Sequence, residues 1–184
     1  TAPLLSDWTA LALSSYTSPE TERAKDALRS YLLGDPSAGT LLTDYERRAM
    51  ALMALGVNPY SGTPTDYIQK IVEGFDGKQF GNPDLINDDI FALLVLVKAG
   101  YQSFDVEIAK TITFILSSQE NNGSFGSVDM TAAAIQALAL VSGTEGISSS
   151  LASARGYLQE QQKDSGGFGN VYATSWAMQA IATL

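Results

Sequence analysis

Two segments of this chain repeat one pattern, and this repetition constrains the fold more than any other feature of the sequence. The segments read FILSSQENNGSFGSVDMTAAAIQALAL and YLQEQQKDSGGFGNVYATSWAMQAIATL. Each runs from an aromatic residue through Gln-x-x-x-Gly-x-Phe-Gly into an alanine-rich apolar stretch, and Gln119 and Gln162 lie 43 residues apart. A fixed period of this length predicts repeated helical units that stack on one another.

An acidic or hydroxyl residue followed by an apolar helical run occurs five times. The runs begin at Asp7, Asp44, Asp89, Asp129 and Ser175, with a mean step of 42 residues. They are rich in Ala and Leu nearly all round, which is typical of helices covered on every side. Amphipathic helices with a charged stripe are expected between them, at about 20–33, 65–75, 106–118 and 148–162. This alternation predicts an all-α fold of stacked helical hairpins with an inner and an outer layer.

Local signals indicate where these helices begin and end. The five residues that open the apolar runs are expected to be N-caps, because a short oxygen-bearing side chain accepts an unpaired backbone N–H. Gly34, Gly56 and Gly100 are expected to end helices in the left-handed conformation. Without a composition shift or low-complexity linker, a single domain over residues 1–184 is expected.

Composition removes several classes of chemistry. The chain of 184 residues has no cysteine and no histidine, and its net charge is −9. Thiol nucleophiles, histidine relays, disulfides and the usual zinc ligands are therefore excluded. An acidic surface repels nucleic acid and offers nothing to anionic lipid. The longest apolar run, 90–97, is too short to span a bilayer, so membrane insertion is not expected.

The repeated segments resemble the QW motif of terpene cyclases. KTITFILSSQENNGSF and RGYLQEQQKDSGGF carry its basic residue, aromatic, aliphatic run, Gln, Gly and final aromatic, with Phe125 and Phe168 where that motif usually has Trp. FDGKQFG at 75–81 keeps only the Gly and Phe-Gly part, and LLGDPSAG at 32–39 keeps almost none.

This resemblance implies an α/α toroid, an inner ring of helices wrapped by an outer ring. The architecture is shared by squalene and hopene cyclases, protein prenyltransferase β subunits, complement thioester domains and cobalamin carriers. A closed ring usually takes six hairpins, and this chain supplies about four and a half at the observed step. The toroid is therefore expected to be open or incomplete, in a fragment of a longer chain.

The chain is more closely similar to bacterial exported proteins with prenyltransferase/squalene-oxidase repeats. The segments that carry this similarity are TDYERRAMALMALGVNP, NDDIFALLVL and SVDMTAAAIQALAL. Many of those proteins continue into a transcobalamin-like or surface-anchoring domain. The similarity implies an extracellular or cell-surface location, with other domains of the same longer protein as partners. The likeness to cobalamin carriers makes a corrinoid the first candidate ligand, and no other cofactor is expected.

The Gln–Gly–Phe groups have a structural interpretation, and we name them clasps. The first clasp is Gln119, Gly123 and Phe125, and the second is Gln162, Gly166 and Phe168. In each, the glutamine is expected to reach exposed N–H groups of the next helix, the glycine to allow a sharp turn, and the aromatic ring to stack over the amide. The alternative is direct ligand contact by Gln119 or Gln162.

Each chemistry of the resembled family can be tested against the residues. Prenyltransferases need a zinc site of Asp, Cys and His, and thioester domains need a Cys–Gln pair, so both are excluded. Class II terpene cyclases protonate an alkene with an Asp-x-Asp-Asp motif, and the nearest match, INDD, has Ile86 in the first position. Asp88 and Asp89 are simply explained as helix-start residues. No catalytic residue is therefore predicted; an enzyme would use Asp88 and Asp89 with a raised pKa.

Two further arrangements remain open. Asp7, Asp44, Asp89 and Asp129 could form a carboxylate ring that holds a cation, although each is expected to cap a helix and no metal site is predicted. An apolar or planar ligand, a hydrophobic small molecule for example, could meet aromatic and Met side chains at one end of a central cavity. These candidates are Trp8, Tyr45, Phe91, Met130 and Trp176. Their alternative role is core packing between the layers.

The leading hypothesis is a non-catalytic binding or scaffold toroid of an exported bacterial protein. The alternatives are a fragment of a terpene cyclase-like enzyme and a structural repeat of a surface-layer protein.

Overall fold

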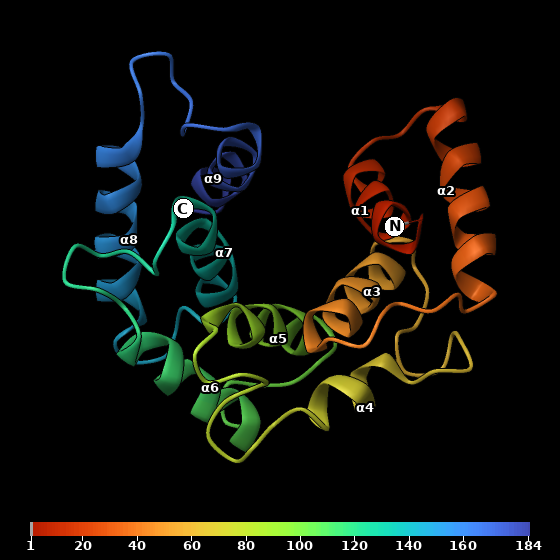
Figure 1. Cartoon of the computed structure of the whole chain (residues 1–184), viewed down its shortest axis with the longest axis horizontal. Helices are drawn as coiled ribbons and strands as arrows, with labels where there is room; N and C mark the ends of the chain where they lie inside the picture. Colours follow the sequence, from red (N-terminus) through yellow and green to blue (C-terminus); the bar gives the residue numbers. More distant parts are fainter. Residues whose placement is uncertain (1) are drawn as a thin grey trace. The chain divides into compact units, whose positions relative to one another are not determined.

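The computed structural model of the chain describes residues 2–184, with side chains from residue 5 onward, and no strand occurs within them (Figure 1). The helices are α1 (Ala2–Ser14), α2 (Pro19–Leu33), α3 (Leu42–Ala54), α4 (Tyr67–Val72), α5 (Ile86–Lys98), α6 (Val106–Ser117), α7 (Val128–Ala139), α8 (Ile147–Gln161) and α9 (Val171–Thr183). The predicted all-α class is confirmed. The chain divides into two compact units, Thr1–Phe75 and Asp76–Leu184.

The first unit has two layers of helices. Its inner helices, α1 and α3, pack against each other, while α2 packs on α1 and α4 packs on α3. The amphipathic helix α2 begins after Ser18, whose hydroxyl accepts the N–H of Thr21 at 3.1 Å. Apolar residues such as Leu32 and Leu52 are fully buried between the layers and supply most of the stabilisation from burial.

The second unit repeats this plan with one more helix. The inner helices α5, α7 and α9 follow one another in space, with α7 in contact with both others, while α6 packs on α5 and α8 packs on α7 (Figure 1). Buried Ile, Leu, Val and Ala side chains of α5 and α7 form the core of the unit. Alanine on the inner helices lets neighbouring backbones approach closely.

The expectation that all inner helices are covered on every side is wrong for α1 and α9. Trp8 of α1 is 39% exposed, and Tyr172, Met178 and Ile181 of α9 are more than half exposed. These two helices are exposed because of their positions in the inner layer of their units. Within its own unit each of these helices has an inner neighbour on one side, whereas α7 lies between α5 and α9.

The predicted N-caps are also wrong, because the inner helices begin earlier than expected. The residues that cap or precede them are Leu41, Leu85, Ser127 and Asn170. Asp7 lies inside α1, and Asp44, Asp89, Asp129 and Ser175 are the third, fourth, second and fifth residues of their helices. Asp44 Oδ2 accepts the N–H groups of Thr40 and Leu41 at 3.0 and 3.1 Å. An acid one turn inside a helix can thus reach back over its start, which makes it resemble a cap in sequence.

The outer helices lie close to their expected positions. Helices α2, α6 and α8 begin and end within one residue of the prediction, whereas α4 is shorter than the expected 65–75. Gly56 and Gly100 have φ of +71° and +111°, so their left-handed role is confirmed. Gly34 has φ of −69°, and its prediction is wrong because the chain turns one residue later, where Asp35 has φ of +51°.

Candidate functional site

The two clasps share their central hydrogen bond. Gln119 Nε2 donates to the carbonyl oxygen of Gly123 at 2.9 Å, and Gln162 Nε2 donates to that of Gly166 at 3.0 Å. Both glycines have positive φ, +87° and +82°, which other residues adopt only with strain. The glutamines therefore bind carbonyl oxygens of their own loops. The expected contact, in which the glutamine oxygen accepts N–H groups of the next helix, is not found among the residues whose side chains are described; the amide nitrogen instead donates to a carbonyl oxygen.

A second hydrogen bond joins each clasp to the following inner helix. The N–H of Phe125 donates to Thr131 Oγ1 at 2.9 Å, and the N–H of Phe168 donates to Thr174 Oγ1 at 2.9 Å. Each threonine is the fourth residue of its helix, α7 or α9. Both phenylalanine rings are buried. Each clasp thus positions the loop on the helix that follows it.

Asp89 occupies the corresponding place in α5. It is the fourth residue of that helix, and its Oδ1 accepts the N–H of Phe80 at 2.8 Å. In the same loop Gln79 Nε2 donates to the carbonyl oxygen of Gly81 at 3.1 Å. The weak motif copy FDGKQFG therefore keeps the hydrogen bond between its phenylalanine and the next helix, with an acid in place of a threonine.

Asp88 supports the same loop from the third position of α5. Its Oδ2 accepts the N–H of Asn82 at 3.0 Å. Asp88 also lies close to Gly81, because a Cβ on Gly81 would be 2.1 Å from Asp88 Oδ2. In the first unit, a Cβ on Gly39 would likewise be 2.0 Å from Asp44 Oδ2. Both glycines have positive φ. The two units thus use one arrangement, an acid near the helix start held against a glycine.

Burial changes the protonation of this acidic pair. Asp89 is fully buried and Asp88 nearly so, and Asp89 Oδ2 has no hydrogen-bond partner. Desolvation raises the pKa of Asp89 from 3.8 to about 7; the N–H of Phe80 opposes this shift, and the charge of Asp88 adds to it. Burial also raises the pKa of Asp88. Asp89 is therefore an acid that can keep its proton near neutral pH.

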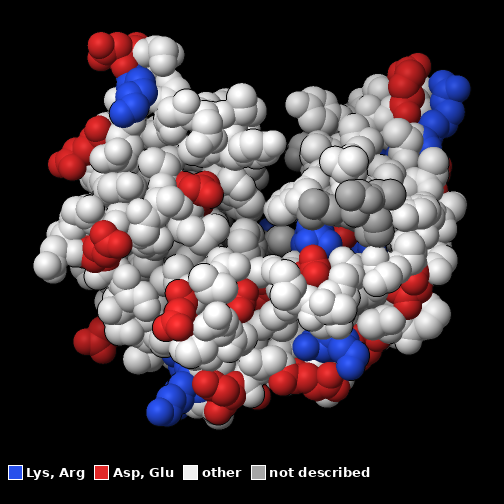
Figure 2. All heavy atoms as spheres, viewed as in Figure 1, with Lys and Arg blue, Asp and Glu red and all other residues white. Residues whose placement is uncertain are grey.

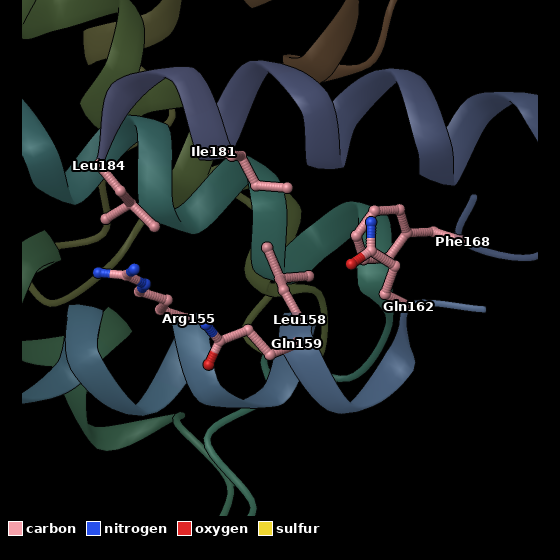
Figure 3. A pocket seen from close by; sticks show the side chains of 7 residues that line it. All are labelled: Arg155, Leu158, Gln159, Gln162, Phe168, Ile181 and Leu184. Atoms are coloured by element: carbon pink, nitrogen blue, oxygen red, sulfur yellow. The ribbon is translucent and has the colours of Figure 1, made fainter. Parts of the chain in front are cut away.

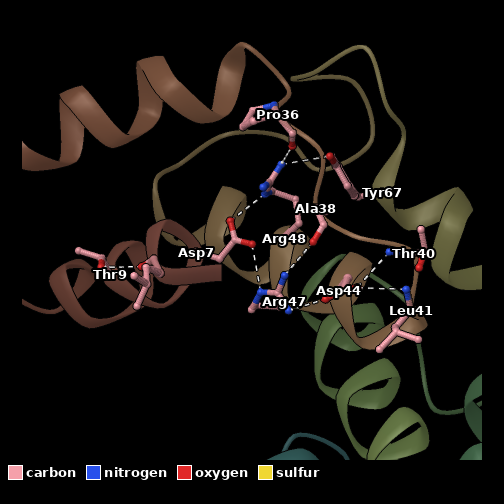
Figure 4. Close-up of polar contacts among 11 residues, drawn as sticks. Asp7, Thr9, Pro36, Ala38, Thr40, Leu41, Asp44, Arg47, Arg48 and Tyr67 are labelled. Carbon is pink, nitrogen blue, oxygen red and sulfur yellow. Dashed lines mark hydrogen bonds and ion pairs between the residues drawn. The ribbon is translucent and has the colours of Figure 1, made fainter. Parts of the chain in front are cut away.

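The first unit contains a buried ion-pair network that the sequence did not predict (Figure 4). Asp7 Oδ1 accepts from Arg48 Nε at 2.7 Å, and Asp7 Oδ2 accepts from Arg47 Nε at 3.1 Å. Arg47 also donates to Asp44 Oδ1 at 2.8 Å. The available signal was the charged triplet of YERRAM, within an inner run whose counterparts DIFALL and DMTAAA have no charged residue at those positions.

This network extends to the loop after α2 and to α4. Arg48 donates to the carbonyl oxygen of Pro36 at 2.7 Å and to the Tyr67 hydroxyl at 3.2 Å, and that hydroxyl donates to Asp35 Oδ1 at 2.6 Å. Burial and the hydrogen bond to Asp35 raise the pKa of Tyr67 to about 12. The network therefore joins α1, α3 and α4 through charged and polar groups.

The proposed carboxylate ring is not formed among the residues whose side chains are described. They contain no group of three or more Asp or Glu side chains placed to hold a metal ion. Asp7 and Asp44 bind arginines, Asp89 accepts a backbone N–H, and Asp129 accepts from the Ser127 hydroxyl at 2.7 Å.

The candidate ligand-lining residues are distributed over both units. In the first, Trp8 is partly exposed on α1, and the Tyr45 ring lies 6.3 Å from that of Tyr67. In the second, Phe91 of α5 and Trp176 of α9 meet edge to face, with ring centroids 5.7 Å apart, and Met130 is half-buried. The structure thus brings Phe91 and Trp176 together.

A solvent-exposed groove lies between α8 and the C-terminal half of α9, and we call it the α8–α9 groove. Its volume is about 350 Å³. Leu158, Gln162 and Phe168 line one side, while Ile181 of α9 and Leu184, which follows that helix, point toward them (Figure 3). Arg155 lies at the end nearest Leu184 (Figure 3). The surface over α9 is uncharged in Figure 2, since that helix has no charged residue.

Gln119 borders a second, shallower hollow of about 530 Å³ with Glu120, Asn121 and Asn122. Each clasp glutamine therefore borders a surface hollow. A ligand in that hollow would contact the glutamine side chain.

Within residues 2–184, none of the helices has the length and apolar character needed to cross a membrane. No protein-family model, curated protein or solved structure matches the chain.

Proposed function

We propose that the chain is a non-catalytic binding or scaffold module, with an α/α toroid arrangement, of an exported bacterial protein. The observation that carries this proposal is the equivalence of Asp89 with Thr131 and Thr174. All three are the fourth residue of an inner helix and accept the N–H of the preceding loop phenylalanine. Because a threonine performs the same task twice, the position requires a hydrogen-bond acceptor and not an acid.

The toroid arrangement is supported by features within each unit. Both units have an inner and an outer layer, and within the second unit the two clasps make the same hydrogen bonds. In the second unit Phe91 and Trp176 touch although α7 lies between their helices. A flat layer with helices about 8–10 Å apart would separate α5 and α9 by twice that spacing, so the contact favours a curved inner layer.

The binding role is supported by the exposed apolar surface on α9 and the α8–α9 groove. Exposed apolar patches of this kind on otherwise well-packed proteins mark interaction sites. The exported location and a corrinoid ligand rest on the resemblance alone. In the resembled carriers the ligand lies between the toroid and a second domain, so the corrinoid proposal applies to a longer protein with such a domain.

A second candidate function is terpene cyclisation. One observation favours it: Asp89 is fully buried, and burial raises its pKa to about 7, as an alkene-protonating acid requires. Against it, Asp89 Oδ1 is occupied by the Phe80 N–H, and neither the α8–α9 groove nor the hollow beside Gln119 includes Asp89.

Product analysis distinguishes the two functions. The protein and its Asp89→Asn variant are incubated with squalene and with geranylgeranyl diphosphate, and the extracts are examined by mass spectrometry. Asparagine keeps the size and the acceptor but carries no acidic proton. We expect no cyclised product from either protein. Product formed by the unaltered protein and lost in Asp89→Asn would establish the cyclase and overturn the non-catalytic proposal.

A further inference from the structure

Asn122 and Gly123 lie next to each other in the turn of the first clasp, and the fold gives them opposite surroundings. Asn122 is exposed to solvent, while Gly123 is buried. They form the only Asn-Gly dipeptide of the sequence. Asparagine is among the thermolabile residues of proteins. It is most open to attack by its own main chain when a glycine follows, because glycine has no Cβ to shield the backbone nitrogen.

The reaction open to this dipeptide is deamidation through a ring. The Gly123 nitrogen attacks Cγ of Asn122, the N–Cγ bond forms and the Cγ–Nδ2 bond breaks. The proton of the Gly123 N–H leaves with Nδ2 as ammonia, and a five-membered succinimide remains. Solvent water then opens the ring. Cleavage at Cγ gives aspartate, and cleavage at the main-chain carbonyl carbon gives isoaspartate, in which the chain runs through the former side chain.

Two hydrogen bonds occupy the reacting groups in the folded chain. The N–H of Gly123 donates to the carbonyl oxygen of Glu120 at 2.8 Å. Asn122 Oδ1 accepts the N–H of Ser124 at 2.9 Å, which fixes the side chain within the turn. Because the Gly123 nitrogen must give up its proton to bind Cγ, its hydrogen bond to Glu120 opposes the attack. The turn must therefore open before the ring can form.

Helix α8 keeps this turn closed. Gln119 Nε2 donates both to the carbonyl oxygen of Gly123 at 2.9 Å and to that of Ser150 in α8 at 3.0 Å. The backbone of α8 passes so close that a Cβ on Gly123 would lie 2.3 Å from the carbonyl oxygen of Ser153. Gly123 thus has no room to rotate toward Asn122 without displacing α8 or the loop.

The second clasp repeats the turn without the reactive side chain. The N–H of Gly166 donates to the carbonyl oxygen of Lys163 at 2.7 Å, as that of Gly123 does to Glu120. At the 43-residue spacing, Ser165 stands in the place of Asn122. A serine side chain has no carbonyl carbon for the nitrogen to attack. The reaction is therefore confined to the first clasp, and the second clasp provides a control within the same chain.

We infer that Asn122–Gly123 is a site of spontaneous modification, to aspartate and isoaspartate, which the closed first clasp protects and its opening exposes. Isoaspartate adds one carbon to the main chain beside Gly123, where α8 leaves no room for a further atom. Aspartate adds a negative charge close to Glu120. Because a modified turn cannot close as before, each opening that leads to reaction leaves a permanent mark on the chain.

Peptide mapping over time tests this inference. The protein is kept warm at mildly alkaline pH, and samples are digested with a glutamate-specific protease, which releases the fragment 121–145. Mass spectrometry measures the replacement of the amide by a hydroxyl, and electron-transfer fragmentation locates it and distinguishes isoaspartate from aspartate. We expect conversion at Asn122, while Asn170, which is followed by valine, stays unchanged over the same period.

The rates show whether the clasp controls the reaction. Conversion at Asn122 should be at least tenfold faster in the protein unfolded in urea than in the folded protein. Gln119→Ala should accelerate it about tenfold, since the loss of two hydrogen bonds of ordinary strength shifts an opening equilibrium by about that factor. Gln162→Ala, which loosens the other clasp, is the matched control and should leave the rate unchanged. Circular dichroism checks that both variants fold.

Asn122→Ser copies the second clasp and should abolish conversion of the fragment 121–145. Conversion that persists in this variant would place the reaction elsewhere and overturn the inference. It would equally be overturned by absence of conversion at Asn122, by equal rates in the folded and the urea-unfolded protein, or by equal rates in Gln119→Ala and Gln162→Ala. The comparison of folded with unfolded protein needs no substitution, so it decides the matter even if Gln119→Ala does not fold.

Discussion

The two units share a two-layer plan but treat buried charge in opposite ways. In the unit Thr1–Phe75, Asp7 is neutralised by Arg47 and Arg48 at hydrogen-bond distance. In the unit Asp76–Leu184, the buried charged residues are Asp88 and Asp89, which face backbone N–H groups and no cation. In the first unit the buried carboxylate is balanced by two guanidinium groups at hydrogen-bond distance, whereas in the second unit burial raises the pKa of Asp89 to about 7. One architecture thus tolerates polar groups inside an inner helix by two different physical means.

The largest expected effect is that of breaking the ion pairs of the first unit. Asp7→Ala would leave two buried arginines without their shared carboxylate, which typically costs about 3–5 kcal/mol. The measurement is the free energy of local unfolding of α3 by native-state hydrogen exchange, compared with α7 as an internal reference. Asp26→Ala removes an exposed ion pair with Arg29 and should cost about 0–1 kcal/mol. If the two substitutions lowered the free energy of local unfolding equally, the buried network would not stabilise the unit more than an exposed ion pair does.

A smaller effect is expected from the two clasps. Gln119→Ala removes two hydrogen bonds, one of them to α8, while Gln162→Ala removes one bond at an exposed site. At about 0.5–1.5 kcal/mol for each bond, the first substitution should destabilise the second unit roughly twice as much. Urea unfolding followed by tryptophan fluorescence measures the difference, because Trp176 lies in this unit. A larger loss for Gln162→Ala would contradict the view that only the first clasp binds an outer helix.

The sequence predicted the parts of this molecule that depend on local chemistry. The alternation of helices, the limits of α2, α6 and α8, and the recurrence of the clasps all follow from periodicity and from residues within a few positions of one another. The helix starts were misplaced because acids at the third and fourth helical positions, such as Asp44 and Asp89, accept backbone N–H groups from the segment before the helix and are not its caps. Local composition does not distinguish these positions.

The features that the sequence did not predict depend on distant contacts. Arg47 and Arg48 were missed because their partner, Asp7, lies 40 or 41 residues away. The exposure of α9 could not be read from its composition, because α9 is about as apolar as the buried α7. The raised pKa of Asp89 likewise follows from burial by neighbours that only the folded chain brings together.

The central claim is that Asp89 is a buried hydrogen-bond acceptor, equivalent to Thr131 and Thr174. The most direct test measures the unfolding free energy of the unaltered protein and of Asp89→Thr between pH 4 and 7. Because the pKa of Asp89 is raised in the folded state, to about 7 from 3.8, the folded protein binds more protons than the unfolded chain in this range. The unaltered protein must therefore lose stability from this group as the pH rises.

We expect Asp89→Thr to fold, to keep the Phe80 amide protected from hydrogen exchange, and to gain stability relative to the unaltered protein as the pH rises from 4 to 7. Asp89→Ala, which removes the acceptor, should lose that protection. A difference between Asp89→Thr and the unaltered protein that does not change with pH, or loss of Phe80 protection in Asp89→Thr equal to that in Asp89→Ala, would contradict the account.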